Sequence, residues 1–185
     1  MKLQIERVCN MRYHNITKDD MLNGYGIRTV LWVAGCEHNC PGCHNPITHD
    51  INGGIVFDVS AKQEIFEELK KDYVSGITYS GGDPLHPINA NEIGELIKEI
   101  AVKFPNKNQW LYTGYMFEDI IKYDFIKLLD VVCDGKFEIK LFDRNLKWVG
   151  SSNQRVIDVK KTISQNKIVL FDDNFDGNPT LKSYK

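Results

Sequence analysis

The stretch TVLWVAGCEHNCPGCHN, residues 29–45, joins a short apolar run to a loop that holds three cysteines. The run from Thr29 to Ala34 is almost continuously apolar, which is typical of a buried strand in a parallel sheet. Glycine, proline and asparagine follow at once, so the strand is expected to end where the cysteines begin. This order predicts a cysteine loop at the carboxyl end of a central strand, where parallel α/β sheets bind their ligands.

The rest of the chain alternates between strand and helix patterns. Runs typical of strands occupy residues 3–8, 29–34, 76–82, 109–114, 130–135, 155–159 and 167–171. Helical spacing of apolar residues covers 60–73, 89–104 and a short piece at 116–123, and Ser60 with Gln63 resembles a capping box. We expect a polar loop between the first two strands, and a frayed tail from about residue 172 to residue 185. The segment between the last two strands fits no single pattern.

This alternation predicts one α/β domain over residues 1–185, with a mostly parallel sheet. A closed eight-stranded barrel needs about 250 residues. The chain has 185, so we expect an open partial (β/α) barrel. The loops after each parallel strand should then line one mouth, bringing the cysteine loop together with the glycine-rich turn SGGDP (residues 80–84).

Composition excludes several classes of protein. Hydrophobic residues make up 42% of the chain and charged residues 26%, which is typical of a globular protein. The net charge of −2 gives no basic excess of the kind that nucleic-acid binders show. No apolar run is long enough to span a membrane, and the first residues lack a signal-peptide pattern. We therefore expect a cytoplasmic protein whose five cysteines stay reduced.

Three thiols within eight residues suit either of two kinds of metal site. A structural zinc ion takes four protein ligands, so it would need one more. Candidates for that fourth ligand are His38, His44, His49, Cys9 and Cys133. An iron–sulfur cubane held by three cysteines instead leaves one iron open to a small molecule with adjacent amino and carboxylate groups. The absence of a second C-x-x-C pair favours the cluster.

The spacing C-x3-C-x2-C resembles the signature of the radical S-adenosylmethionine enzymes. Further blocks resemble, in order along most of the chain, one family of glycyl-radical-enzyme activases, the anaerobic ribonucleoside-triphosphate reductase-activating proteins. These blocks are GYGIRTVLWVAGCEHNCPGCHN (24–45), GITYSGGDPLHP (76–87), WLYTGYMFED (110–119), VVCDGKF (131–137) and GSSNQRVIDV (150–159). The elements CPGCHN and SSNQR make the resemblance specific.

The resemblance implies a radical mechanism. Cys36, Cys40 and Cys43 would bind three irons of a 4Fe–4S cluster, and S-adenosyl-L-methionine would chelate the fourth. An electron from a flavodoxin- or ferredoxin-type donor would then cleave the sulfonium C–S bond. The resulting 5'-deoxyadenosyl radical would abstract hydrogen from a glycine Cα of the partner, an anaerobic ribonucleoside-triphosphate reductase.

The resemblance also implies residues that contact the cofactor. They are Gly42, Cys43, His44, Gly81, Gly82 and Asp83. Many radical S-adenosylmethionine enzymes have an aromatic residue where this chain has Gly42, so the contact to adenine is left to His44 or Tyr79. Asp83 is expected to complement the methionine ammonium, while Asn153 and Arg155 are candidates for its carboxylate.

Other functions remain as alternatives at this point. The chain could activate a different glycyl-radical enzyme, such as pyruvate formate-lyase, or resemble a small deazaguanine-type synthase. A structural zinc-binding module is a third reading. A ferredoxin-like electron carrier is disfavoured because no fourth cysteine lies near the three.

Overall fold

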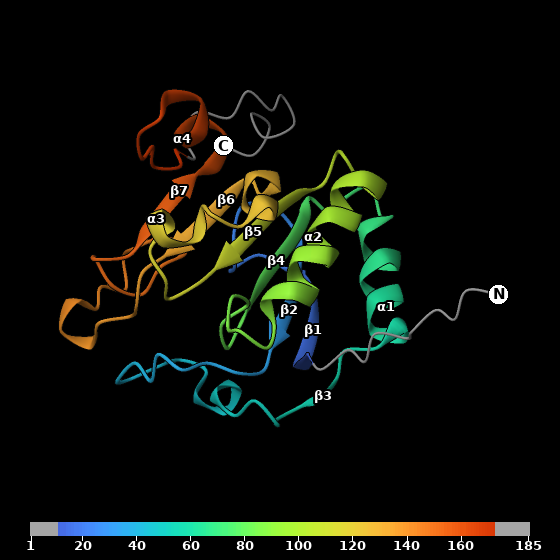
Figure 1. The fold of residues 1–185 in the computed structure, drawn as a ribbon, viewed down its shortest axis with the longest axis horizontal. Coiled ribbons are helices and arrows are strands. Elements are labelled where there is room, and N and C mark those ends of the chain that lie inside the picture. The colour runs from blue at the N-terminus through green and yellow to red at the C-terminus, as the bar shows by residue number, and fades with distance from the viewer. Residues whose placement is uncertain (1–10, 173–185) are drawn as a thin grey trace.

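The apolar run at 29–34 forms strand β2 near the middle of a seven-stranded sheet in the computed structural model, which describes residues 11–172 (Figure 1). The sheet has the order β3-β1-β2-β4-β5-β6-β7. Its strands are β1 (Arg12–Asp20), β2 (Arg28–Val33), β3 (Ile55–Val56), β4 (Gly76–Gly81), β5 (Asn108–Tyr112), β6 (Val131–Asp134) and β7 (Arg155–Asp158). The expected strand at 3–8 and the tail beyond residue 172 lie outside the described residues.

The four central strands, β2, β4, β5 and β6, are parallel. Residues on adjacent strands therefore form rows across the sheet. One row joins Leu31, Tyr79, Leu111 and Val132, and all four side chains are buried. Because side chains alternate between faces along a strand, the neighbouring residues form a second row on the opposite face. The central strands thus end at a common edge, as the sequence predicted.

The sheet is α/β but open, and a barrel is not confirmed. Three pairings are antiparallel: β1 with β2, β1 with β3, and β6 with β7. The edge strands β3 and β7 do not pair with each other, so the sheet does not close. The expected mostly parallel sheet is therefore confirmed for the middle of the sheet only.

Strand β1 lies where a polar loop was expected, and that prediction was wrong. Its sequence, RYHNITKDD, is largely polar, and the pairing register shifts between Tyr13 and Asn15. A bulge of this kind breaks the alternation of apolar and polar residues. Tyr13 and Ile16 are consequently both buried although three positions separate them. Hydrogen bonding to β2 and β3, rather than local propensity, holds this segment as a strand.

Two long helices cover one face of the sheet. They are α1 (Val59–Leu69) and α2 (Ala90–Lys103), which lie side by side in Figure 1. Ser60 with Gln63 was expected to cap the first of these helices, but α1 begins at Val59 and its N-cap is Asp58, whose carboxylate accepts a hydrogen bond from the Ala61 amide. This correction follows the usual preference for aspartate at an N-cap.

The carboxyl-terminal part of the described chain has only short elements. Its helices are α3 (Phe117–Ile120), α4 (Val159–Gln165) and the 3₁₀ helices η2 (Asp124–Leu128) and η3 (Ile139–Leu141), while a further 3₁₀ helix, η1 (Pro46–His49), follows β2. The expected strand at 167–171 is reduced to a single bridge between Leu170 and Ile157. No helix within residues 11–172 is long and apolar enough to cross a membrane.

Candidate active site

The cysteine loop, residues 35–45, leaves the end of β2 and is closed by η1. The amide of Gly35 donates to the Thr48 carbonyl at 2.8 Å, and the amide of Cys36 donates to the His49 carbonyl at 3.2 Å. Through these bonds the chain stays hydrogen-bonded at residues 35 and 36, beyond the end of β2. The loop is therefore anchored at both ends, and its cysteines lie between two fixed points.

Cys36, Cys40 and Cys43 are all half-buried, and none of them forms a disulfide. The amide of Asn45 donates to Cys43 Sγ at 3.4 Å, a contact that stabilises negative charge on the sulfur. Burial raises the pKa of the Cys36 thiol, and the Asp83 carboxylate adds to this effect. A bound metal ion would reverse the shift, because coordination favours the thiolate.

A cavity of about 440 Å³ opens beside these cysteines, on the face of the sheet away from α1 and α2. This volume lies in the ordinary range for small-molecule sites. The residues from the central strands and the loops after them that line it include Cys36, His38, Cys40, Cys43, His44, Gly81, Gly82, Asp83, Tyr112, Thr113, Cys133, Lys136, Phe137 and Gln154. The predicted convergence of loops at one mouth is confirmed.

The glycine-rich turn follows β4 and packs tightly against β2. The amide of Gly82 donates to the Val33 carbonyl, and the amide of Asp83 donates to the Gly35 carbonyl, both at 2.8 Å. These amides are consequently engaged within the protein. The carbonyl oxygens of Gly81 and Gly82 accept hydrogen bonds but do not donate them, so they suit a ligand group that donates.

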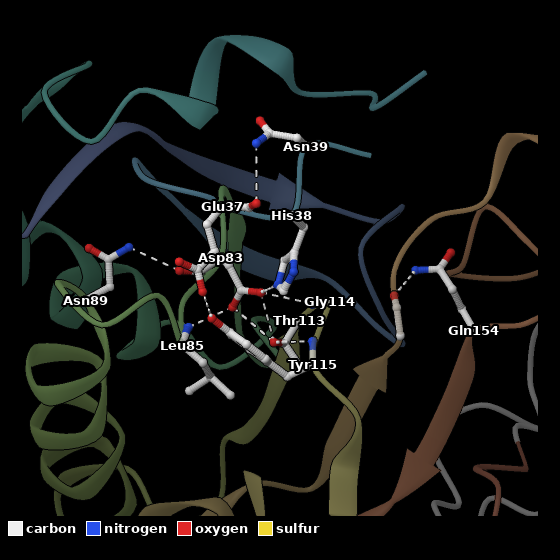
Figure 2. Close-up of polar contacts among 11 residues, drawn as sticks. Glu37, His38, Asn39, Asp83, Leu85, Asn89, Thr113, Gly114, Tyr115 and Gln154 are labelled. Atoms are coloured by element: carbon white, nitrogen blue, oxygen red, sulfur yellow. Dashed lines mark hydrogen bonds and ion pairs between the residues drawn. The ribbon is translucent and has the colours of Figure 1, made fainter. Parts of the chain in front are cut away.

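Asp83 is buried at the centre of a network of donors (Figure 2). The amide of Leu85 donates to Oδ1, and the amide of Gly114 donates to Oδ2. The Thr113 hydroxyl lies 3.0 Å from both oxygens, and His38 Nε2 lies 2.6 Å from Oδ2. The carboxylate that was expected to meet the methionine ammonium is thus already surrounded by donors from the protein.

Aromatic side chains form one wall near the third cysteine. The ring of His44 lies 5.6 Å from that of Phe137 and 6.4 Å from that of Phe142. Gly42 has φ +76°, and a Cβ placed there would lie 3.0 Å from Ile139 Cδ1. The segment after β6 therefore covers Gly42, the residue before the third cysteine.

Three residues weighed as cofactor contacts lie elsewhere. Tyr79 is fully buried on the face covered by the helices, and its hydroxyl donates to Gln109 Oε1. Arg155 binds Asp134 and Glu118. The side-chain amide of Asn153 donates to the backbone carbonyl of Lys136. None of the three lines the cavity.

The GYGIR segment, residues 24–28, lies on the same face of the sheet as the cavity, at the end where the central strands begin. Arg28 is fully buried, donates to Thr78 Oγ1 and the Tyr25 carbonyl, and lies 5.1 Å from the ring centre of Trp110. Burial lowers the pKa of this guanidinium to about 10, so it remains charged at neutral pH. The last part of the loop before β2 is thereby fixed against Trp110.

Sequence reasoning considered His38 only as a possible zinc ligand and missed its contact with Asp83. It chose His44 because that residue adjoins Cys43, yet His44 is exposed and the His38 side chain is only 5% exposed. The partners of His38 follow β4 and β5, at positions 83 and 113–115, and only the tertiary structure brings these loops together. The blocks SGGDP and TGY, both noted in the sequence, were the available signal.

The donor set fits an iron–sulfur cluster. In a cubane each cysteine binds a different iron, so its thiols are spread out. Three free thiols along one anchored loop, beside a cavity of ligand size, match that requirement.

Comparison with known proteins agrees with this geometry. Residues 22–157 match a family model described as a 4Fe–4S single cluster domain. An anaerobic ribonucleoside-triphosphate reductase-activating protein of Enterobacteria phage T4 is 44% identical over 146 residues, covering 79% of this chain and 93% of that protein. A protein of the same name from Escherichia coli K12 is 40% identical over 150 residues, covering 79% and 97%. One from Haemophilus influenzae is 36% identical over 148 residues, covering 78% and 96%.

Proposed function

Because this chain belongs to the family of anaerobic ribonucleoside-triphosphate reductase-activating proteins, we propose that it activates such a reductase by reductive cleavage of S-adenosylmethionine, which generates a glycyl radical on the partner. The observation that carries this proposal is the position of three free cysteines on one loop, at the mouth of a cavity of about 440 Å³. A metal site next to room for a small organic molecule is what such chemistry needs.

Cys36, Cys40 and Cys43 are the proposed ligands of a 4Fe–4S cluster. When bound, the cluster supplies the single electron that splitting a sulfonium C–S bond requires. The protein keeps the three thiols on a loop anchored by η1. The amide of Asn45 stabilises charge on Cys43, and partial burial limits the access of water to the thiols.

The cofactor contacts are proposed as follows. The carbonyl oxygens of Gly81 and Gly82 accept hydrogen bonds from the methionine ammonium, since the amides of Gly82 and Asp83 are engaged with the β2 segment. Asp83 holds the surrounding loops in place, through the donors that already bind it. His44, beside Phe137, offers an aromatic surface for the adenine ring.

The partner is a protein, because the names of the relatives specify activation of a reductase. Those names favour it over pyruvate formate-lyase as the glycyl-radical enzyme. We further propose that a flavodoxin- or ferredoxin-type protein supplies the electron, and that the reaction takes place in the cytoplasm.

The test is anaerobic reconstitution with iron and sulfide, followed by metal and sulfide analysis. The proposal predicts about four irons and four sulfides per chain, with a brown colour that dithionite bleaches. S-adenosylmethionine should then change the electron paramagnetic resonance signal of the reduced cluster and yield 5'-deoxyadenosine. One zinc ion without sulfide would contradict the proposal and favour a structural zinc module.

A further inference from the structure

We propose that Glu37, His38, Asp83 and Tyr115 form a latch that fixes the first half of the cysteine loop and so sets the positions of the cluster ligands. This inference rests on the proposed function, because it concerns how the loop holds a cluster. The four residues come from three loops, those that follow β2, β4 and β5. None of them is a proposed ligand, so they act as positioning residues.

The contact between His38 and Asp83 is the centre of the latch (Figure 2). Nε2 and Oδ2 are 2.6 Å apart, and the two side chains are only 5% and 2% exposed. Asp83 is itself held by the amides of Leu85 and Gly114 and by the Thr113 hydroxyl. The carboxylate is therefore a fixed point, and the imidazole that donates to it is fixed in turn.

The ring of His38 is also enclosed by the loop after β5. It packs edge-on against Tyr115, with ring centres 4.6 Å apart and planes at 71°. A Cβ on Gly114 would overlap the imidazole, so only glycine leaves room for the ring at this position. The Tyr115 hydroxyl then donates to Glu37 Oε1 at 2.6 Å. Two consecutive residues of the cysteine loop are thus attached to the end of β5.

This attachment complements the one made by η1. The bonds of Gly35 and Cys36 to residues 48 and 49 fix the start of the loop. The latch fixes the next two residues, which lie between the first and second cysteines. A loop ordered in advance loses less conformational freedom when metal binds, so the cluster is held more tightly. In metal sites generally, groups that orient the ligands change metal affinity by about 10- to 100-fold when they are removed.

A purely structural role would give a different result. In His38→Phe the Asp83 carboxylate keeps three donors, those of Leu85, Thr113 and Gly114, so it is not left buried without partners. His38→Phe keeps the ring packing against Tyr115 and removes the hydrogen bond to Asp83. If the latch positions the ligands, this variant should hold its cluster poorly while its unfolding temperature changes little.

The experiment measures how fast anaerobically reconstituted protein releases iron to an excess of chelator, beside thermal unfolding of the same variants without metal. We expect His38→Phe to release iron about tenfold faster than the unchanged protein. Tyr115→Phe, which removes only the bond to Glu37, should show a smaller increase. His38→Gln, whose amide can still donate to Asp83, should restore most of the retention. Tyr73→Phe is the matched control, since Tyr73 is exposed and lies outside the site.

Several outcomes would overturn the latch. One is iron release at the rate of the unchanged protein in both His38→Phe and Tyr115→Phe. Another is faster iron release only in variants whose unfolding temperature has fallen in proportion. If His38→Phe does not fold, Tyr115→Phe against Tyr73→Phe decides the question. An unchanged protein that fails to bind about four irons would refute the proposed function itself, and the latch with it.

Discussion

Ile139 packs over Gly42 so closely that a Cβ on the glycine would lie 3.0 Å from its Cδ1 atom. Gly42 also has φ +76°, a conformation that other L-residues adopt only with strain. The segment after β6 and the cysteine loop are therefore fitted to each other at the residue before Cys43. A Cβ at position 42 therefore requires the Ile139 side chain to move by a few tenths of an ångström.

Gly42→Ala should lower the free energy of unfolding by about 1–2 kcal/mol, the usual cost of a left-handed conformation for a residue with a Cβ. Gly42→Tyr should lower it further, because its ring must displace Ile139. Denaturant unfolding of the protein without metal measures both effects. In the Ile139→Ala background the extra cost of tyrosine should shrink, while the cost of alanine persists. A Gly42→Tyr variant as stable as the unchanged protein would show that the fit described here is wrong.

Replacing Cys36, Cys40 or Cys43 by alanine should reduce iron and sulfide to near background after reconstitution, because each thiolate is proposed to bind a different iron. Cys133→Ala is the control: this buried thiol on β6 lines the cavity but does not belong to the cysteine loop, and its variant should retain about four irons. Iron analysis and visible absorption check both. Normal iron content in any of the three loop variants would refute the assignment of ligands.

The central sheet was predictable because each of its strands is a short run with buried apolar residues that stops at or near a glycine. Residues 29–34, 76–82 and 130–135 all gave the expected strands, and their common edge placed the site. β1 was not predictable, since its pairing bulge removes the alternation on which such reasoning depends. The antiparallel edge strands also left no local signal, because the direction of pairing is decided by partners distant in sequence.

The site divides in the same way. The three cysteines could be identified as metal ligands from their spacing, and the glycine-rich turn could be placed at the site because it follows a strand. The partners of Asp83 could not be found from sequence, because Thr113 and Gly114 reach it only through the fold. The same is true of Arg155, whose charge suggested a ligand carboxylate but whose actual partners are Asp134 and Glu118.

Arg155→Met should destabilise the fold by about 3 kcal/mol, because it leaves the fully buried Asp134 carboxylate without its cation. Glu118→Gln removes only the exposed part of the same network and should cost less than about 1 kcal/mol. Chemical denaturation at neutral pH compares the two variants. If both variants lose the same free energy of unfolding, the view that buried Asp134 needs the charge of Arg155 is wrong.

The contribution of Glu118 should depend on pH. Its hydrogen bond to Arg155 holds the pKa of the carboxyl below its usual value. The stabilisation is therefore present above the ordinary glutamate pKa of about 4.3 and is lost as the pH falls through the lower, folded-state pKa. The difference in unfolding free energy between the unchanged protein and Glu118→Gln should accordingly shrink between neutral pH and about pH 3. A difference that grows on acidification would reverse the assigned sign.

The most direct test of the proposed activity combines this protein, S-adenosylmethionine, a reductant and an anaerobic ribonucleoside-triphosphate reductase under strict anaerobiosis. Electron paramagnetic resonance then reports on the reductase. The account predicts a glycyl radical signal that requires every component and disappears when Cys40→Ala replaces the unchanged protein. A cluster-loaded protein that cleaves S-adenosylmethionine but leaves the reductase without a radical would contradict it.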